Sequence, residues 1–433
     1  MTIKPAFGRP MRTSQFSFAP TFTPVNHGSF GAYPRVIQEV QDNFQKQCHE
    51  RPDTFIVYSL PGLIDESRAA IAPLLGVETD EVVLVPNATT GVNTVLRNLK
   101  WEKDDVVVFF STIYDACEKT LASIQEHTPL ETVNIALDYP VRDEEIVRRL
   151  GDTIKRVRDG GKNVRLAMFD TVLTMPGARM PWEELTQVCK EMGVLSLIDA
   201  AHAIGHIDLK HLGEVGPDFF VSNCHKWLYT PRACAIFYIP FRNQHLIRTT
   251  IPTSHGYEPI SPTPPETPDG KTPFVHMFEF VATIDYSPYL CIPAALSFRR
   301  RICGGEEAIR TYCFDIARAG GQRTAEILGT EVMGAKFEGS RMTECAFANV
   351  KLPVRFESAD EKGFQAKDGE RIGMWINRRA VQDFDTYLQI KYQPDGLWVR
   401  LSGQIYLEMS DFEWVACRLK ELCERVEKGE APF

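Results

Sequence analysis

The sequence predicts an α/β protein: a large domain built on a mainly parallel sheet, followed by a small C-terminal α+β domain. Three observations lead to this class. Short apolar runs alternate with segments of helical period between residues 82 and 198, strand-like and helical segments mix beyond residue 301, and 433 residues with 44% apolar side chains can form more than one core. We therefore expect an N-terminal arm and first helix over residues 1–50 that pack with the small domain, a large domain over 51–300 and a small domain over 301–433.

The start of the chain is predicted to lack a long helix. Prolines at positions 5, 10, 20 and 24 interrupt any amphipathic helix, so residues 1–25 are expected to form an extended arm. The turn Asn26–Gly31 follows, and its glycines permit a close approach of the backbone to another group; a plain turn before the next helix is the alternative. Helices are expected over residues 35–48 and 61–75.

Strands and helices then alternate. The expected strands are 82–85, 106–110, 132–136, 164–169 and 194–198, and the expected helices are 92–99, 116–127, 144–158 and 182–192. This order predicts a parallel sheet that is covered on both faces. Because such sheets bind ligands beyond the carboxyl ends of their strands, the residues that follow each strand are the candidate functional residues.

The composition argues against several classes of function. The formal charge is −9 and no block of five like charges occurs, which disfavours a nucleic-acid or anionic-membrane surface. Eleven cysteines without a CxxC pair are typical of reduced thiols, and neither a disulfide framework nor a metal site is expected. No stretch reaches eighteen apolar residues and the N-terminus lacks a signal-peptide pattern, so we expect a cytoplasmic protein; the basic N-terminus hints at mitochondrial import, against which its prolines argue.

A phosphate site is predicted after the first strand. Asn87–Gly91 precedes a helix, and Thr89 and Thr90 offer hydroxyls at the positive helix end. Neither GxxxxGK[ST] nor GxGxxG is present, so neither a nucleoside triphosphate nor a dinucleotide is indicated, and an ordinary helix cap is the alternative. Tyr114 follows the second strand, as a functional aromatic ring at the sheet edge or as plain packing.

An acidic residue ends the fifth strand. Asp199 closes the apolar run Leu197-Ile198, and a carboxylate in this position is costly to bury unless it meets a cation, such as a protonated pyridine nitrogen. His202 follows three residues later. The alternative is a helix N-cap aspartate with a structural histidine.

A lysine follows a further apolar run, in the segment DFFVSNCHKWLYTP. Ser222, His225 and Lys226 come after the strand-like residues 219–221. A desolvated lysine has a lowered pKa, and its neutral amine is the form that makes a Schiff base. A lysine in a surface turn is the alternative.

Phosphate turn, aromatic ring, acidic residue and lysine, in this order, are the parts of a pyridoxal phosphate site. The segments NHGSFGAYP, NATTG, IDAAHAIG and SNCHKWL resemble those of class-V aminotransferase-type enzymes, the group that contains cysteine desulfurases and isopenicillin N epimerase. The resemblance extends from about residue 26 to residue 426. It implies the pyridoxal-phosphate-dependent transferase fold of type I, with pyridoxal 5'-phosphate as the cofactor.

The resemblance also implies a role for each candidate residue. Lys226 is the Schiff-base lysine, Asp199 pairs with the pyridine nitrogen, and His202 contacts the phenolic oxygen of the cofactor. Tyr114 covers the ring. The phosphate is held by Thr89, Thr90, Ser222 and His225, and by Thr283 from a neighbouring subunit, which implies a homodimer.

The C-terminal part supplies the predicted substrate anchor. Arg400 lies within the strand-like segment 397–401, where a guanidinium costs desolvation unless it faces an anion; a structural ion pair is the alternative. The resemblance assigns it to the substrate carboxylate, and assigns Asn26 and His27 to the substrate as well. The other elements expected here are a strand over 344–352 and helices over 293–301, 306–328, 381–390 and 411–426.

Residues 259–273 contain six prolines and are expected to form a stiff loop at the rim of the active site or at a dimer contact.

The reaction is the least readable property. Desulfurases carry a nucleophilic cysteine in a loop that Glu370–Asn377 resembles, but this segment has none. NHGSFG and Tyr114 bring the chain closer to the epimerase-like branch, which includes the fungal hercynylcysteine sulfoxide lyase of ergothioneine biosynthesis. The resemblance favours a carbon–sulfur lyase in which Lys226 takes the Cα proton and Tyr114 protonates the leaving sulfur. An epimerase or aminotransferase is the alternative; a desulfurase or a non-catalytic pyridoxal-phosphate-binding protein is less favoured.

Overall fold

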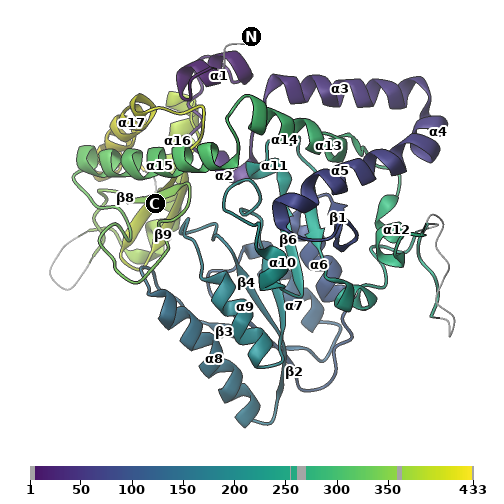
Figure 1. The fold of residues 1–433 in the computed structure, drawn as a ribbon. Helices are drawn as coiled ribbons and strands as arrows, with labels where there is room; N and C mark the ends of the chain where they lie inside the picture. The colour runs from purple at the N-terminus through teal and green to yellow at the C-terminus, as the bar shows by residue number, and fades with distance from the viewer. Residues whose placement is uncertain (1–4, 254, 261–269, 358–362, 432–433) are drawn as a thin grey trace. The chain divides into compact units, whose positions relative to one another are not determined.

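The computed structural model describes residues 5–253, 255–260, 270–357 and 363–431. The chain forms two compact units (Figure 1). The small unit comprises Met1–Phe30, Thr174–Arg179 and Arg299–Phe433, and the large unit comprises Gly31–Leu173 and Met180–Phe298. The domain boundaries expected at residues 50 and 300 stay a prediction; the compact units divide the chain near residues 30 and 298 and place 31–50 in the large unit.

The large unit contains a seven-stranded sheet. Its strands are β1 (Val82–Val85), β2 (Asp105–Phe110), β3 (Glu131–Ile135), β4 (Asn163–Asp170), β5 (Leu195–Asp199), β6 (Phe219–Asn223) and β7 (Ala235–Tyr238). Their order is β1-β7-β6-β5-β4-β2-β3, and β7 runs antiparallel to both of its neighbours while the other pairs are parallel. The predicted mainly parallel sheet is confirmed.

Strand β7 was not predicted from the sequence. Only the four-residue helix α11 (Cys224–Trp227) and a short turn separate it from β6, so no helical period announces a new strand. The turn uses left-handed backbone at Tyr229, with φ of 70°, and at Ala233, with φ of 68°. The chain thus reverses beside the lysine segment.

Helices cover the sheet of the large unit because the strands are apolar on both faces. Residues such as Val107, Met168 and Phe237 form one core with α6 (Ala88–Asn98), α7 (Asp115–Gln125) and α12 (Pro273–Glu279). Figure 1 shows α8 (Asp143–Asp159) and α9 (Trp182–Glu191) along the sheet, where they contact β4 and β5. In β2 and β6 the alternate residues are buried too, so both faces are covered, as expected for a parallel sheet.

The large unit contains further helices before β1, after β5 and after β7. They are α3 (Arg35–Glu50), α4 (Pro52–Thr54), the π-helix η1 (Phe55–Ser59), α5 (Leu60–Leu75), η2 (Thr79–Glu81), α10 (Leu212–Val215), η3 (Phe241–Leu246), α13 (Ser287–Leu290) and α14 (Ile292–Arg301), whose last three residues belong to the small unit.

The small unit contains a three-stranded antiparallel sheet of order β8-β10-β9. Its elements are α1 (Arg9–Gln15), α2 (His27–Phe30), α15 (Glu306–Leu328), β8 (Phe347–Lys351), η5 (Ala366–Asp368), α16 (Gly369–Phe384), β9 (Gln389–Gln393), β10 (Gly396–Ser402) and α17 (Met409–Glu427). Helices α15 and α17 lie side by side (Figure 1).

Two expectations about the small unit were wrong. The segment 381–390 is not one helix, because α16 ends at Phe384, Asp385 adopts left-handed backbone with φ of 47°, and β9 begins at Gln389. The N-terminal arm is not wholly extended, because Pro10 lies in the first turn of α1, where a missing N–H costs no hydrogen bond. Glu370–Asn377, the segment that resembles the cysteine-bearing loop of desulfurases, lies inside α16.

All eleven cysteines have free thiols, and nine of them are buried. Among the described residues, no helix has the length and apolar character needed to span a bilayer.

Candidate active site

Lys226 lies at the centre of the site in the large unit. Strand β6 leads into α11, and the half-buried Lys226 places its Nζ 3.2 Å from Nε2 of His202. The structure therefore brings together the predicted lysine and the predicted histidine, which are 24 positions apart in the sequence.

The His202 ring is held by an indole. His202 is buried, and its Nδ1 accepts a hydrogen bond of 3.2 Å from Nε1–H of Trp227. Sequence reasoning assigned no role to Trp227, because its contact with His202 joins the loop after β5 to α11 and leaves no local signal.

Asp199 ends β5 as a buried carboxylate. Its Oδ1 accepts from the backbone N–H of Ala201 at 3.0 Å, and its Oδ2 accepts from the thiol of Cys117 at 3.2 Å. Both donors are neutral, and within the part of the chain that the structure describes Asp199 makes no ion pair. A buried carboxylate that lacks a cation fits a protonated pyridine nitrogen, so this donor set fits pyridoxal phosphate.

Asp170 is a site residue that the sequence reasoning missed. It ends β4 beside Asp199 in the parallel register, and burial followed by the charge of Asp199 raises its pKa well above the usual range. The signal was available, because Asp170 closes an apolar strand in the same way as Asp199.

The predicted phosphate turn begins α6. The side chain of Asn87 caps this helix by accepting from N–H of Thr90 at 2.9 Å and from its hydroxyl at 3.0 Å. The turn is tied to the lysine segment, because N–H of Ala88 donates to Oδ1 of Asn223 at 2.9 Å. The Thr90 hydroxyl hydrogen is thus committed to Asn87, whereas the Thr89 side chain is exposed at the helix end.

Ser222 and His225, both predicted to hold the phosphate, each donate their hydrogen to a backbone carbonyl. Ser222 is fully buried, donates to the carbonyl of Ala200 and accepts from N–H of Ile204 at 2.9 Å, so its single hydrogen already has a partner. His225 is half-buried, and its Nδ1–H donates to the carbonyl of Cys234 at 2.9 Å, so the neutral ring presents a lone pair at Nε2. Burial lowers the pKa of His225 to about 4, so the ring is neutral near pH 7.

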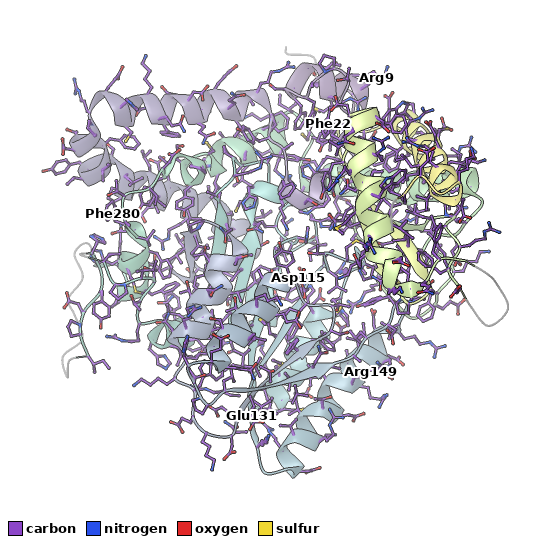
Figure 2. All side chains as sticks on the ribbon, turned by 180° about the vertical axis from the view of Figure 1, so that it is seen from behind. Arg9, Phe22, Asp115, Glu131, Arg149 and Phe280 are labelled. Carbon is purple, nitrogen blue, oxygen red and sulfur yellow. The ribbon has the colours of Figure 1, made fainter. Side chains whose placement is uncertain are left out.

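Tyr114 lies at the N-terminus of α7, next to the residue Asp115 labelled in Figure 2. Its side chain is 44% exposed. Partial burial, followed by the charges of Asp199 and Asp115, raises the pKa of the Tyr114 phenol. The phenol therefore keeps its proton at neutral pH.

The glycine turn packs on the lysine segment through Gly31. Gly31 has a φ of 67°, and a Cβ on it would lie 1.8 Å from the carbonyl oxygen of His225. Only glycine permits this approach.

Arg400 forms the second candidate site, in the small unit. It is fully buried in β10; its Nη1 donates to the carbonyl of Thr174 at 2.7 Å, and its Nη2 donates to Oδ1 of Asn26 at 3.1 Å and to Oγ of Ser29 at 3.0 Å. The guanidinium carbon lies 4.5 Å from the ring centroid of Phe347. Burial lowers the pKa of Arg400 to about 10, which still leaves it charged at neutral pH.

Arg400 has no acidic partner among the described residues, and its buried Nε–H has no acceptor there. The alternative of a structural ion pair is therefore not supported. A buried guanidinium with an unused donor fits an incoming carboxylate.

Asn26 orients Arg400, and Ser29 and Thr174 are partners that the sequence did not indicate. His27 is buried, with its Nδ1 2.7 Å from the hydroxyl of Tyr406.

The other predicted positions are less informative. Thr283 is exposed in the large unit. Much of the proline-rich segment 259–273 lies outside the described residues. Cys345 of the small unit is buried, and burial raises the pKa of its thiol to about 11.

Comparisons with known proteins agree with this geometry. The family model Aminotransferase class-V matches residues 33–257, just over half of the chain. The chain is 36% identical to the L-cysteine desulfhydrase-like protein lolT1 of Epichloe uncinata, with 97% of this chain and 96% of the relative covered. It is 29% identical to the hercynylcysteine sulfoxide lyase of Schizosaccharomyces pombe (96% and 98% covered) and 30% identical to the L-cysteine desulfhydrase of Arabidopsis thaliana (92% and 87% covered).

Solved structures share the fold. A mutant of C-DES with glycine covalently linked to the PLP cofactor matches with a TM-score of 0.77 and 19% identity, covering 95% of this chain and 99% of that chain. A complex of the cystine C-S lyase C-DES with its product cysteine persulfide matches with a TM-score of 0.75 and 19% identity, covering 93% and 98%. The fold is thus the type I fold of pyridoxal phosphate enzymes, and the chain belongs to the class-V aminotransferase family of these enzymes.

Proposed function

We propose that the protein is a pyridoxal-phosphate-dependent carbon–sulfur lyase that cleaves a cysteine-derived amino acid by β-elimination. The relatives named as cysteine desulfhydrases or as a hercynylcysteine sulfoxide lyase support the choice of bond, since they are similar along almost the whole chain.

The environment of Arg400 is the observation that supports an amino-acid substrate. A fully buried guanidinium without an acidic partner in the described residues is unfavourable unless an anion joins it during function. An α-carboxylate offers two oxygens in one plane, which match the planar donors of arginine. The guanidinium is held in place for this contact by the side chains of Asn26 and Ser29 and by the backbone carbonyl of Thr174.

The large unit supplies the residues that would hold the cofactor. Asp199 would pair with the ring nitrogen, Lys226 would bind the carbonyl carbon, and His202 would donate to the phenolic oxygen. Thr89 and the N-terminus of α6 would bind the phosphate. Bound pyridoxal phosphate supplies an electron sink that lowers the barrier to breaking a bond at Cα.

Proton transfers belong to two side chains. The neutral amine of Lys226 takes the Cα proton. The leaving sulfur needs a proton, and Tyr114 would supply it, because its raised pKa keeps the phenol protonated at neutral pH. The overall balance is one substrate and one water converted to a sulfur compound, pyruvate and ammonium.

Within this class of reaction we propose that the substrate is a cysteine S-conjugate, such as the sulfoxide of hercynylcysteine. L-cysteine is the competing candidate substrate. An epimerase or aminotransferase is the second candidate function, since isopenicillin N epimerase of Streptomyces clavuligerus is 29% identical over 93% of this chain. Desulfurase chemistry is disfavoured, because the buried, protonated thiol of Cys345 is a poor nucleophile.

The test is incubation of the cofactor-loaded protein with L-cysteine and with cysteine S-conjugates and their sulfoxides. We expect equal amounts of pyruvate and ammonium, and neither with Lys226→Ala, which should also lose the visible absorbance of the bound cofactor. Inversion at Cα without pyruvate would instead identify an epimerase. A keto acid that retains the sulfur substituent would identify an aminotransferase.

A homodimer completed by Thr283 and a cytoplasmic location remain part of this proposal. The exposure of Thr283 is compatible with a contact to a second copy.

A further inference from the structure

We infer that Trp227 is a positioning residue that sets the tautomer of His202 and thereby the proton that faces Lys226. The inference rests on the proposed function in one respect: Lys226 is taken to be the lysine that binds the cofactor.

The indole of Trp227 can only be the donor in its hydrogen bond with His202. Nε1–H is a donor and never an acceptor, and it points at Nδ1 of His202 over 3.2 Å. Nδ1 must therefore present a lone pair. In a neutral imidazole the proton then lies on Nε2.

The proton on Nε2 faces Lys226, because Nε2 and Nζ are 3.2 Å apart. A neutral amine accepts this hydrogen bond, whereas an ammonium has no lone pair to offer. The indole of Trp227 thus favours the neutral amine of Lys226 indirectly, through the proton that it keeps on Nε2 of His202. When the cofactor is bound, the same N–H is available to an anionic oxygen, whereas the other tautomer would direct a lone pair at it.

Close contacts on two sides hold Trp227 in position for this hydrogen bond. The ring of His206 stacks on the indole, with centroids 4.0 Å apart and planes 19° apart, and Nδ1–H of His206 donates to the carbonyl of His202 at 2.7 Å. On the backbone side, a Cβ at Gly205 would lie 2.6 Å from the carbonyl oxygen of Trp227. Gly205 has a φ of 76°, so glycine meets both requirements.

The chain offers a matched control for removal of the indole N–H. Trp182 is a second fully buried tryptophan of the large unit, and its Nε1–H has no acceptor among the described residues. Trp182→Phe and Trp227→Phe remove the same atoms from buried positions. Only Trp227→Phe removes the donor to His202.

The experiment is magic-angle-spinning NMR of cofactor-free protein labelled with ¹⁵N-histidine, near neutral pH, with His202→Gln used to assign the His202 signals. We expect wild type and Trp182→Phe to show His202 with a protonated Nε2 and an unprotonated Nδ1. Trp227→Phe should lose this single-tautomer pattern. It should also bind pyridoxal phosphate about tenfold more weakly, as expected for one lost hydrogen bond, while Trp182→Phe stays within about twofold.

A protonated Nδ1 in wild type, or an unchanged tautomer in Trp227→Phe, would overturn the inference. The wild-type measurement alone decides the first point, even if Trp227→Phe does not fold. Because the tautomer is read without cofactor or substrate, its outcome is independent of the lyase assay, and failure of the proposed function is seen separately in that assay.

Discussion

Two buried charges, Asp199 and Arg400, distinguish this protein from an ordinary α/β core. Neither makes an ion pair in the described part of the chain, and the hydrogen-bond partners that each has there are neutral. Arg299 provides the contrast, since it is equally buried but pairs with both carboxylate oxygens of Glu306. The structural Arg299 is paired with a carboxylate of the protein, whereas Arg400 is expected to pair with the carboxylate of the substrate.

Arg400→Lys should therefore damage substrate binding. Lysine keeps the charge but cannot reproduce the planar contacts, and charge-assisted hydrogen bonds contribute about 1.5–3 kcal/mol, so we expect kcat/KM to fall about 10- to 100-fold or more. The absorbance of the bound cofactor should be retained. Arg299→Lys is the control: it should lower the melting temperature and leave KM unchanged, and equal KM values in both variants would refute the carboxylate role.

His225 should make the stability of the cofactor-free protein depend on pH. Its folded-state pKa of about 4 lies below the unfolded value of 6.5, so the stabilisation is present above pH 6.5 and is lost as the pH falls to about 4. The shift corresponds to at most about 3 kcal/mol. His225→Gln should reduce the fall in the midpoint of urea unfolding that occurs as the pH is lowered. His49→Gln, which alters an exposed histidine, should leave this fall unchanged. Identical profiles of urea midpoint against pH for His225→Gln and wild type would refute the assignment to His225.

At the scale of elements, the site is built from the carboxyl ends of adjacent strands. β4 ends in Asp170, β5 ends in Asp199 and β6 leads into Lys226, so three parallel neighbours bring their last residues to one edge. Most of these strands were predicted, because apolar runs with intervening helical periods are local signals. The antiparallel β7 and the break between α16 and β9 were not, since each depends on backbone turns that tertiary contacts stabilise.

The contact of α6 with β6 predicts an unfavourable glycine substitution. A Cβ on Gly91 would lie 2.6 Å from Cγ1 of Val221. Gly91→Ala should therefore lower stability by about 1–3 kcal/mol through overpacking, although alanine favours helix by about 1 kcal/mol. Val221→Ala should restore part of the melting temperature in this background, and a Gly91→Ala variant as stable as wild type would contradict the close packing of α6 on β6.

At the scale of the whole molecule, the proposed homodimer makes a prediction about mixed subunits. Lys226→Ala and Thr283→Ala would each inactivate a different component of a shared site. If Thr283 completes the partner's site, random pairing of the two inactive variants should restore about one quarter of wild-type activity, because half of the dimers contain one intact site. Reassembly without activity, with dimers verified by sedimentation, would place Thr283 outside the partner's site.

The sequence by itself determined the fold class, the family and the order of the candidate residues, because these reside in local periodicity and in short segments such as SNCHKWL. Tertiary structure decided how each residue is used. It showed that the Ser222 hydroxyl donates to the carbonyl of Ala200, that Asn26 orients Arg400, and that Trp227 donates to His202. These contacts join residues between 22 and 374 positions apart, and the availability of a proton or a lone pair depends on the neighbour that folding supplies.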